Sequence, residues 1–233
     1  FIKRYGDRLG ILYVETGASQ RPSKVIYDRQ YSPLTELKEN DFDWDQIFEG
    51  KDWFHFSGTA PALSDSTSHI VKKACIKAKE HGLKVSCDLN YRKKLWSSQK
   101  ASSVMTQLME HVDVLIGNEE DADKVFGIKA QNTDVTSGNL DGEKYKEVAD
   151  KLYKKFHFEY VAITLRESIS ASDNKWSAML YDGKNFKFSK KYAIHLVDRV
   201  GGGDSFSGAL IYSLLNGFDT LKAVEFSSAA SCL

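Results

Sequence analysis

Several features that define other classes of protein are scarce or missing in this chain. Its 233 residues contain three cysteines without C-x-x-C spacing, Cys75, Cys87 and Cys232, which argues against a disulfide framework or a zinc site and favours reduced core thiols. The formal net charge is zero, so the composition does not favour binding to nucleic acid or to an anionic membrane. There is no run of about 18 apolar residues and no signal peptide. Together these absences predict a cytoplasmic protein.

The sequence is long enough, and at 42% hydrophobic residues apolar enough, to bury a sizeable core. It shows no internal repeat, and we expect residues 1–233 to form a single domain. The chain opens at Phe1 without a methionine and stops at Leu233 inside a helical pattern. We therefore expect sequence to be missing at both ends.

Two patterns of secondary structure divide the chain. Residues 9–16 and 24–29 are rich in β-forming residues and predict a small antiparallel pair. From residue 53 onward, short apolar strands alternate with amphipathic helices, which predicts an α/β fold with a mostly parallel sheet covered on both faces. The expected strands are 52–57, 84–88, 114–117, 160–165, 176–181 and 185–188, and the expected helices are 64–81, 98–112, 121–126, 143–156, 204–216 and 220–232.

The most informative stretch is Gly201-Gly202-Gly203-Asp204, which runs into an apolar helical pattern. A glycine turn at a helix start leaves backbone N–H groups unpaired, and these favour an anion such as phosphate. A carboxylate would repel that phosphate, so Asp204 is better suited to take a proton from an attacking hydroxyl. The alternative is a tight turn in which Asp204 is an ordinary helix N-cap.

The glycine stretch lacks the patterns of two other nucleotide-binding loops. No Lys-Ser or Lys-Thr follows the glycines as in a P-loop, and Phe206 occupies the last glycine position of G-x-G-x-x-G, which disfavours a dinucleotide-dependent dehydrogenase. Polar residues do follow the predicted strands, at 88–92, 118–121 and 164–170. Because ligands of such sheets bind at the carboxyl ends of the strands, we expect these segments to line one site.

Phosphoryl transfer requires a base or positioning group, positive charge near the phosphates and usually Mg²⁺. Arg92 could neutralise a carboxylate or a phosphate of the substrate, or it could form a surface salt bridge with Asp88 or with a neighbouring residue. The segment from Asn118 to Asp121 offers oxygen ligands for hydrated Mg²⁺. It also fits an acidic first helical turn favoured by the helix dipole, and the two interpretations are compatible.

The segment 198–206 resembles D-x-x-G-A-G-D-x-F, the second signature of the ribokinase-like (PfkB) carbohydrate kinases, with Gly202 in place of Ala. The resemblance extends over nearly the whole chain, because the motifs follow one another in the same order as in this family. They are D-x-N-x-R, a segment like N-x-x-E, T-x-R and the glycine turn. The resemblance implies a ribokinase-like three-layer sandwich with a small antiparallel lid sheet at about residues 9–30. It also implies an ATP- and Mg²⁺-dependent sugar kinase in which Gly201, Gly202 and Gly203 form the anion hole and Asp204 is the general base.

Within that family the segments 9–29, 55–64 and 87–96 look most like the branch that acts on the sugar acid 2-keto-3-deoxygluconate. The resemblance then implies residues in three roles. The substrate-binding residues are Tyr13, Tyr27, Arg29, Thr59, Arg92 and Asp204. The nucleotide-binding residues are Asn118, Thr164, Arg166, Ser168, Gly201 and Gly203. Asn118 and Asp121 would hold Mg²⁺ through water, with Asp121 in place of the family's Glu.

Three departures from the family pattern and three rival interpretations accompany this assignment. Glu167 and Ser168 replace a usual glycine, and neither the family's amino-terminal Gly-Gly nor its carboxy-terminal adenine-binding segment is in this sequence. We attribute the latter two to the missing ends. The rivals are a kinase of a neutral sugar such as fructose or ribose, a non-catalytic sugar- or nucleotide-binding relative, and the dinucleotide-dependent dehydrogenase disfavoured above. For the expected lid segment alone, the alternative is a peripheral hairpin. Two arginines favour an acid substrate. The resemblance is also compatible with a homo-oligomer formed through the lid sheet.

Overall fold

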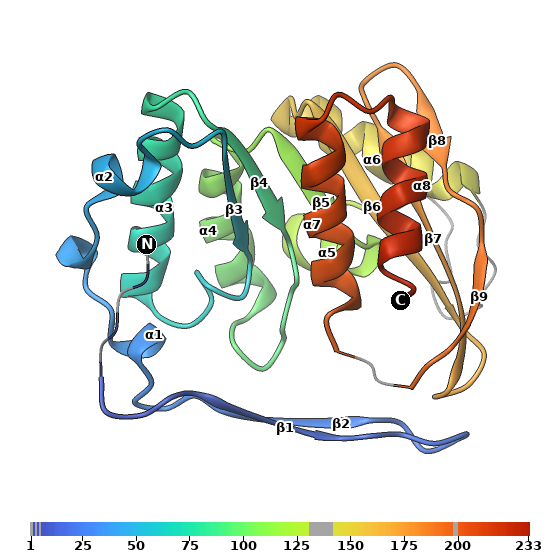
Figure 1. Cartoon of the computed structure of the whole chain (residues 1–233), viewed down its shortest axis with the longest axis horizontal. Coiled ribbons are helices and arrows are strands. Elements are labelled where there is room, and N and C mark those ends of the chain that lie inside the picture. The colour runs from blue at the N-terminus through green and yellow to red at the C-terminus, as the bar shows by residue number, and fades with distance from the viewer. Residues whose placement is uncertain (1, 3, 5, 131–141, 198–199) are drawn as a thin grey trace. The chain divides into compact units, whose positions relative to one another are not determined.

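The structure is a computed structural model that describes residues 2, 4, 6–130, 142–197 and 200–233. The chain divides into two compact units. Unit 1 comprises Phe1–Tyr13, Val25–Leu115 and Glu120–Gly127, and unit 2 comprises Val14–Lys24, Ile116–Glu119 and Ile128–Leu233. Figure 1 labels the helices and strands of both units.

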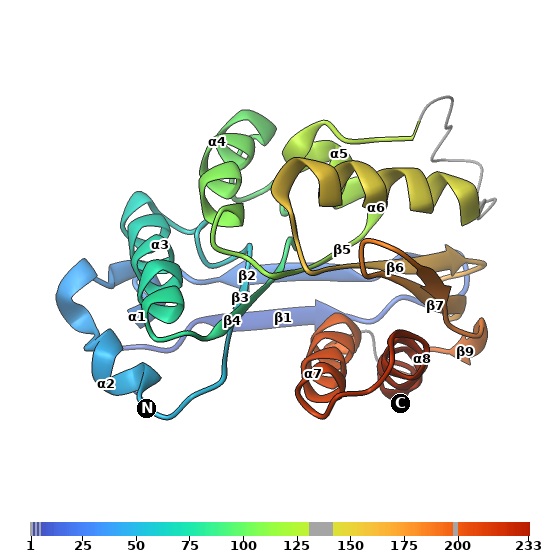
Figure 2. The same cartoon turned by 90° about the horizontal axis from the view of Figure 1, so that it is seen from above.

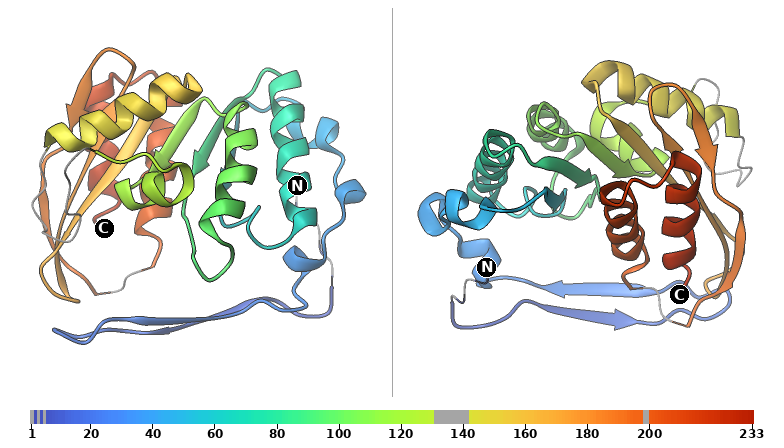
Figure 3. Two further views of the ribbon diagram at one scale, coloured as in Figure 1. Left: turned by 180° about the vertical axis from the view of Figure 1, so that it is seen from behind. Right: turned by 45° about the horizontal axis from the view of Figure 1, so that its top comes forward.

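Unit 1 is built on the parallel pair β3 (Trp53–Ser57) and β4 (Lys84–Asp88), in register from Trp53↔Lys84 to Ser57↔Asp88. Its helices are α1 (Pro33–Glu36), the 3-10 turn η1 (Glu39–Asp41), α2 (Trp44–Phe48), α3 (Asp65–Glu80) and α4 (Ser98–Met109). Helices α3 and α4 lie side by side (Figure 3, left). Helix α3 buries the face predicted from its spacing: Ile70, Val71, Ala74 and Ala78.

The ends of α3 follow from its sequence. The Ser64 hydroxyl accepts the N–H of Thr67 at 3.1 Å while the Thr67 hydroxyl accepts the N–H of Ser64 at 2.9 Å, which closes a reciprocal cap. At the other end Gly82 has φ +74°, a left-handed conformation that glycine adopts without strain. The cap at Ser64 and the glycine at Gly82 fix where α3 begins and ends, and β4 then starts at Lys84, as expected.

Unit 2 is built on the antiparallel strands β6 (Tyr160–Ser168) and β7 (Asp173–Tyr181). The short strands β8 (Phe186–Phe188) and β9 (Tyr192–His195) both pair with β7. Helix α6 (Gly142–Phe156) covers one face of these strands, and α7 (Gly202–Leu215) and α8 (Thr220–Ala230) cover the other (Figure 2). Helices α7 and α8 pack together (Figure 3, right).

Four elements include residues of both units: β1 (Ile11–Glu15), β2 (Lys24–Asp28), β5 (Val114–Gly117) and α5 (Glu119–Phe126). Strands β1 and β2 form the small two-stranded sheet, and the strand order of the larger sheet is β3-β4-β5-β6-β7-β8, with β9 beside β7. The expected fold class, an α/β fold with a mostly parallel central sheet and a small antiparallel sheet, is confirmed.

Several expectations about elements were wrong, and one segment cannot be compared. Strand β6 runs to Ser168 and not to Leu165, β7 begins at Asp173 and not at Trp176, and α5 begins at Glu119 and not at Asp121. The short elements α1, η1 and α2 and the strand β9 were not expected at all. The expected loop at 130–142 falls mostly on residues 131–141, outside the described residues. In the part of the chain that is described, no helix combines the length and apolar character needed to cross a membrane.

Candidate active site

The glycine turn at the start of α7 gives the clearest local geometry in unit 2. Gly201 is the residue before the helix and has φ +86°, which an L-residue adopts only at a cost. The first intrahelical hydrogen bond runs from the N–H of Ser205 to the carbonyl of Gly201 at 2.8 Å. The N–H groups of Gly202, Gly203 and Asp204 therefore precede the helical ladder, as an anion hole requires.

Asp204 is the third residue of α7 and is exposed. Its carboxylate has no hydrogen-bond or ion-pair partner among the residues that the structure describes, and Gly201, the residue before α7, provides no side-chain cap. The alternative interpretation of Asp204 as an ordinary N-cap was therefore wrong. A cap satisfies backbone groups of its own helix, whereas this carboxylate is available to a ligand.

Gly202 replaces the alanine of the family signature at little structural cost. A Cβ placed on Gly202 would meet only the carbonyl oxygen of Ser231, at the ordinary contact distance of 3.5 Å. The turn thus has room for either residue. The signature's first two positions, Asp198 and Arg199, lie outside the described residues.

Thr164, Arg166 and Ser168 lie on β6, not in a loop after it as the sequence suggested. The register with β7 continues to Ser168↔Asn174, so the three residues alternate along one strand and share one of its faces. The Thr164 hydroxyl donates to the carbonyl of Gly117 at 3.4 Å, and the Ser168 hydroxyl donates to Asn174 Oδ1 at 3.0 Å. Arg166 and Ser168 are exposed.

The acidic segment that follows β5 already uses two of its carboxylates within the protein. The Tyr145 hydroxyl donates to Glu119, and burial together with this carboxylate raises the pKa of Tyr145 well above its usual value. Asp121 is buried, and its Oδ1 accepts the backbone N–H of Tyr91 at 3.0 Å. Asn118 is half-buried between β5 and α5.

These contacts limit how the segment could hold Mg²⁺. Among the described residues, no group of three or more His, Cys, Asp or Glu side chains is arranged to bind a metal ion. Mg²⁺ commonly keeps several waters and uses one or two protein oxygens together with substrate phosphates. The amide oxygen of Asn118 and the carboxylate of Asp121 are each of a ligand type that Mg²⁺ accepts.

The ends of β3 and β4 in unit 1 are bound tightly to each other. A Cβ on Gly58 would lie 2.1 Å from the carbonyl oxygen of Leu89, so only glycine fits there. The Ser57 hydroxyl accepts Asn90 Nδ2 at 3.0 Å and the Thr59 hydroxyl at 3.2 Å. This hydroxyl joins Thr59 to the loop that carries Arg92. The sequence interpretation missed the part played by Ser57, which follows from its place directly before Gly58.

Arg92 is exposed four residues beyond the end of β4. Its guanidinium has no ion-pair or hydrogen-bond partner within the described part of the chain, so the alternative of a salt bridge with Asp88 was wrong. An arginine that is held by its backbone and not by its side chain is available to a carboxylate or a phosphate.

Tyr13 on β1 and Tyr27 on β2 are exposed on the two-stranded sheet. Arg29 follows β2 directly, and its guanidinium carbon lies 4.4 Å from the centre of the Tyr27 ring, a cation–π contact. Arg8, which the sequence interpretation missed, donates to both carboxylate oxygens of Asp28, at 3.0 and 2.6 Å, and to the carbonyl of Gln30 at 3.2 Å. It therefore holds the two residues that flank Arg29.

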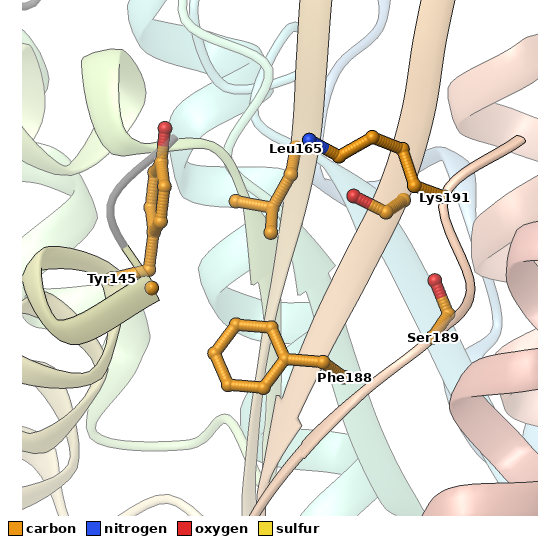
Figure 4. Close-up of a pocket in the computed structure, with 7 residues that line it drawn as sticks. Tyr145, Leu165, Phe188, Ser189 and Lys191 are labelled. Atoms are coloured by element: carbon orange, nitrogen blue, oxygen red, sulfur yellow. The ribbon is translucent and has the colours of Figure 1, made fainter. Parts of the chain in front are cut away.

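A cavity of about 140 Å³ lies in unit 2 and contains none of the expected site residues. Tyr145 lines it from α6 and Leu165 from β6, while Phe188, Ser189 and Lys191 lie on the opposite side from Tyr145 (Figure 4). Lys191 is paired with Glu167 at 3.2 Å.

The expected residues thus fall into two groups. Those assigned to the sugar, apart from Asp204, belong to unit 1, as does Asp121. Asn118, the β6 residues and the glycine turn with Asp204 belong to unit 2.

Comparison with known proteins identifies the class. The whole chain, residues 1–233, matches the pfkB family carbohydrate kinases, and the chain belongs to this family. A solved structure of 2-dehydro-3-deoxygluconokinase from Thermotoga maritima is similar to it, with 52% identity and a TM-score of 0.91, over 97% of this chain and 67% of that one.

Two curated relatives also have names of sugar-acid kinases. The 2-dehydro-3-deoxygalactonokinase of Haloferax volcanii is 31% identical over 97% of this chain, and the 5-dehydro-2-deoxygluconokinase of Clostridium perfringens (strain 13 / Type A) is 26% identical over 98%. The chain spans 64% and 62% of the lengths of these two relatives.

Proposed function

We propose that this chain belongs to an ATP-dependent kinase that transfers the γ-phosphoryl group of ATP to a hydroxyl of 2-keto-3-deoxygluconate, the compound also called 2-dehydro-3-deoxygluconate. The observation that carries the proposal is the start of α7, where three backbone N–H groups precede the helical ladder. Beside them lies the exposed carboxylate of Asp204, which has no hydrogen-bond or ion-pair partner among the residues that the structure describes. The names of the similar proteins support the choice of a sugar acid.

In this proposal Asp204 accepts the proton of the substrate hydroxyl as its oxygen attacks the γ-phosphorus. A new O–P bond forms, the bond from the γ-phosphorus to the bridging oxygen breaks, and ADP leaves. The N–H groups of Gly202, Gly203 and Asp204, which follow the turn at Gly201, carry the charge of the transferred group. Asp204 has no cap to maintain, so proton transfer costs no structural contact.

Kinases of this family use ATP, and the residues proposed for the nucleotide lie in unit 2. They are Asn118, Thr164, Arg166, Ser168, Gly201 and Gly203. Mg²⁺ would supply positive charge on the phosphates, with Asn118 and Asp121 as its water-mediated supports. The hydroxyls of Thr164 and Ser168 are held by hydrogen bonds, so their orientation is fixed before a ligand binds.

The proposed contacts to the sugar acid are Tyr13, Tyr27, Arg29, Thr59 and Arg92. A sugar acid carries a carboxylate, and two arginines without ion-pair partners in the described part of the chain suit it. A neutral sugar would give the positive charges of Arg29 and Arg92 no partner in the substrate. A kinase of fructose or ribose is therefore the second candidate function. The free, reduced state of the three cysteines is in keeping with a cytoplasmic enzyme.

We also propose that the protein forms a homo-oligomer through the lid sheet of β1 and β2. All five residues of β1 are exposed, including Ile11, Leu12, Tyr13 and Val14, and Ile26 on β2 is 52% exposed. Because side chains alternate along a strand, Leu12 and Val14 lie on the face opposite Tyr13. One face could then contact the sugar while the other packs against a second copy.

The test is ADP release by the full-length protein with Mg-ATP and a panel of acceptors. The panel contains 2-keto-3-deoxygluconate, its galactonate epimer, gluconate, fructose and ribose. Turnover with the keto-deoxy acids and not with the neutral sugars is expected. Turnover with fructose or ribose alone would retain Asp204 as the base and overturn the proposed role of the two arginines. If no acceptor in the panel leads to ADP release, the result would indicate a binding protein.

A further inference from the structure

The loop after β4, residues 88–92, is fixed from two directions within unit 1. Asn90 has φ +39°, an unusual backbone conformation for a residue other than glycine, and its side chain donates to Ser57. The next residue, Tyr91, donates its backbone N–H to Asp121 Oδ1 at 3.0 Å. The Tyr91 hydroxyl donates to the carbonyl of Trp96 at 3.2 Å. Arg92 follows these two anchored residues.

Burial and the charge of the acceptor both strengthen the hydrogen bond from the Tyr91 N–H to the Asp121 carboxylate. Asp121 is 8% exposed, and a buried carboxylate requires hydrogen-bond donors to offset its lost hydration. Hydrogen bonds to an ionised acceptor are roughly twice as strong as those between neutral groups. The carboxylate therefore holds the backbone directly before Arg92, whose own side chain has no partner in the described part of the chain.

We infer that Asp121 is a positioning residue for sugar-acid recognition, because its carboxylate fixes the backbone that presents Arg92. This goes beyond the support of Mg²⁺ or phosphate expected from its place in the N-x-x-E-like motif. The inference rests on the proposed function only for its kinetic test. The geometric part concerns the Tyr91 amide and is independent of any substrate.

The first experiment measures amide hydrogen exchange at Tyr91 by NMR. The wild-type amide is expected to be protected, Asp121→Asn to retain protection because its amide oxygen still accepts, and Asp121→Ala to lose at least about tenfold in protection. Asp123→Ala removes a carboxylate from the same helix and serves as the matched control. Equal protection in Asp121→Ala and wild type would overturn the inference. If Asp121→Ala does not fold, Asp121→Ser replaces it, since its hydroxyl ends one bond short of the carboxylate oxygens.

The second experiment is a double-mutant cycle with Arg92→Ala, read as KM for the acceptor and KM for Mg-ATP. Asp121→Ala is expected to raise the acceptor KM about tenfold in the wild-type background and by less than twofold in the Arg92→Ala background. Asp121→Asn separates charge from geometry, because its amide oxygen can still accept the Tyr91 N–H, and it should therefore raise the acceptor KM less than Asp121→Ala does. Equal increases in both backgrounds, or an increase confined to Mg-ATP, would contradict the inference.

The two experiments also separate this inference from the proposed function. If no sugar acid is turned over, the proposed function fails while the exchange result at Tyr91 still decides whether Asp121 holds the loop. If a neutral sugar is turned over, the cycle is measured with that sugar, and coupling between Asp121 and Arg92 remains the expected result.

Discussion

At the first turn of α7, Asp204 exposes its carboxylate beside N–H groups that no helix carbonyl accepts. Asp204→Asn keeps the size of the side chain and removes its basicity, so the protein should fold normally. Its turnover should fall by about 10²–10⁴, the usual contribution of a general base, with little change in KM for ATP. Steady-state ADP release and a thermal melt measure the two effects, and turnover near that of wild type would contradict the assignment.

Two adjacent glycines of the same turn should differ sharply in their tolerance of alanine. Gly201→Ala would force an L-residue to φ +86°, which costs about 1–2 kcal/mol and moves the N–H groups of the turn. Gly202→Ala meets only one atom at 3.5 Å and should leave both stability and turnover nearly unchanged. Urea unfolding and ADP release compare the two variants, and equal losses in both would show that the turn is not set by the conformation of Gly201.

The two arginines assigned to the sugar acid have a matched control beside them. Arg92→Ala and Arg29→Ala should each raise KM for the sugar acid about tenfold or more, because the substrate carboxylate loses a charged donor, while KM for ATP stays nearly constant. Lys93→Ala removes an exposed charge next to Arg92 and should change neither constant. Steady-state kinetics with each substrate varied in turn measures the split. Equal increases for both substrates would argue against a carboxylate contact.

The residue types of the site could be proposed from the sequence, but their contacts could not. Asp204 and the glycines stand in one short motif, so they were found together. Asp121 was proposed for its motif position, yet its bond to Tyr91 joins residues 30 positions apart, and no local pattern reports such a bond. Arg8 was missed for the same reason, since its partners at residues 28 and 30 are 20 and 22 positions away.

Among the elements, the ends of β3 and β4 approach so closely that one methyl group should separate them. Gly58→Ala would place its Cβ 2.1 Å from the Leu89 carbonyl oxygen, and relieving that overlap should cost about 1–3 kcal/mol of stability and raise KM for the sugar acid. Gly208→Ala, inside α7 with nothing within 4 Å of its Cβ, is the control and should be neutral or stabilising. Denaturant unfolding compares the variants, and a stable Gly58→Ala would contradict the close approach.

Strand β6 shows why the boundary of an element can escape a sequence pattern. Its apolar residues stop at Leu165, and the three residues that follow are polar, which is typical of a loop. In the structure the ladder continues because β7 pairs with those residues, and Glu167 bonds to both Lys175 and Lys191 at 3.2 Å. The hydrogen bonds of the two lysines lower the pKa of Glu167, so the strand end keeps a paired charge at neutral pH.

At the scale of the whole molecule, the lid sheet leads to a prediction about assembly. A double variant, Leu12→Asp with Val14→Asp, places charge on the strand face opposite Tyr13 and should convert a dimer to a monomer if that face contacts a second copy. Analytical ultracentrifugation measures the mass. Ile76→Asp, an exposed apolar residue of α3, is the control and should leave the mass unchanged. A wild-type monomer would contradict the proposed oligomer.

The α/β class was predictable because alternating apolar strands and amphipathic helices leave few arrangements open to a chain of this length. The antiparallel pairing of β9 with β7 was not, since Tyr192–His195 has only four residues, which alternate between half-buried and exposed. The structure divides into two units that are each compact. The expectation that residues 1–233 form a single domain stays a prediction.

The three cysteines differ in accessibility in a way that makes the unmodified chain suitable for site-specific labelling. Cys75 and Cys87 are buried, and burial raises the pKa of Cys75 to about 12, so neither thiol is available to a maleimide. Cys232 is partly exposed and follows Ser231, whose carbonyl oxygen faces Gly202. An environment-sensitive dye coupled to Cys232 would be attached next to Ser231, the residue whose carbonyl oxygen faces the glycine turn. Its emission would then report nucleotide binding directly, without an engineered cysteine and without a coupled enzyme assay.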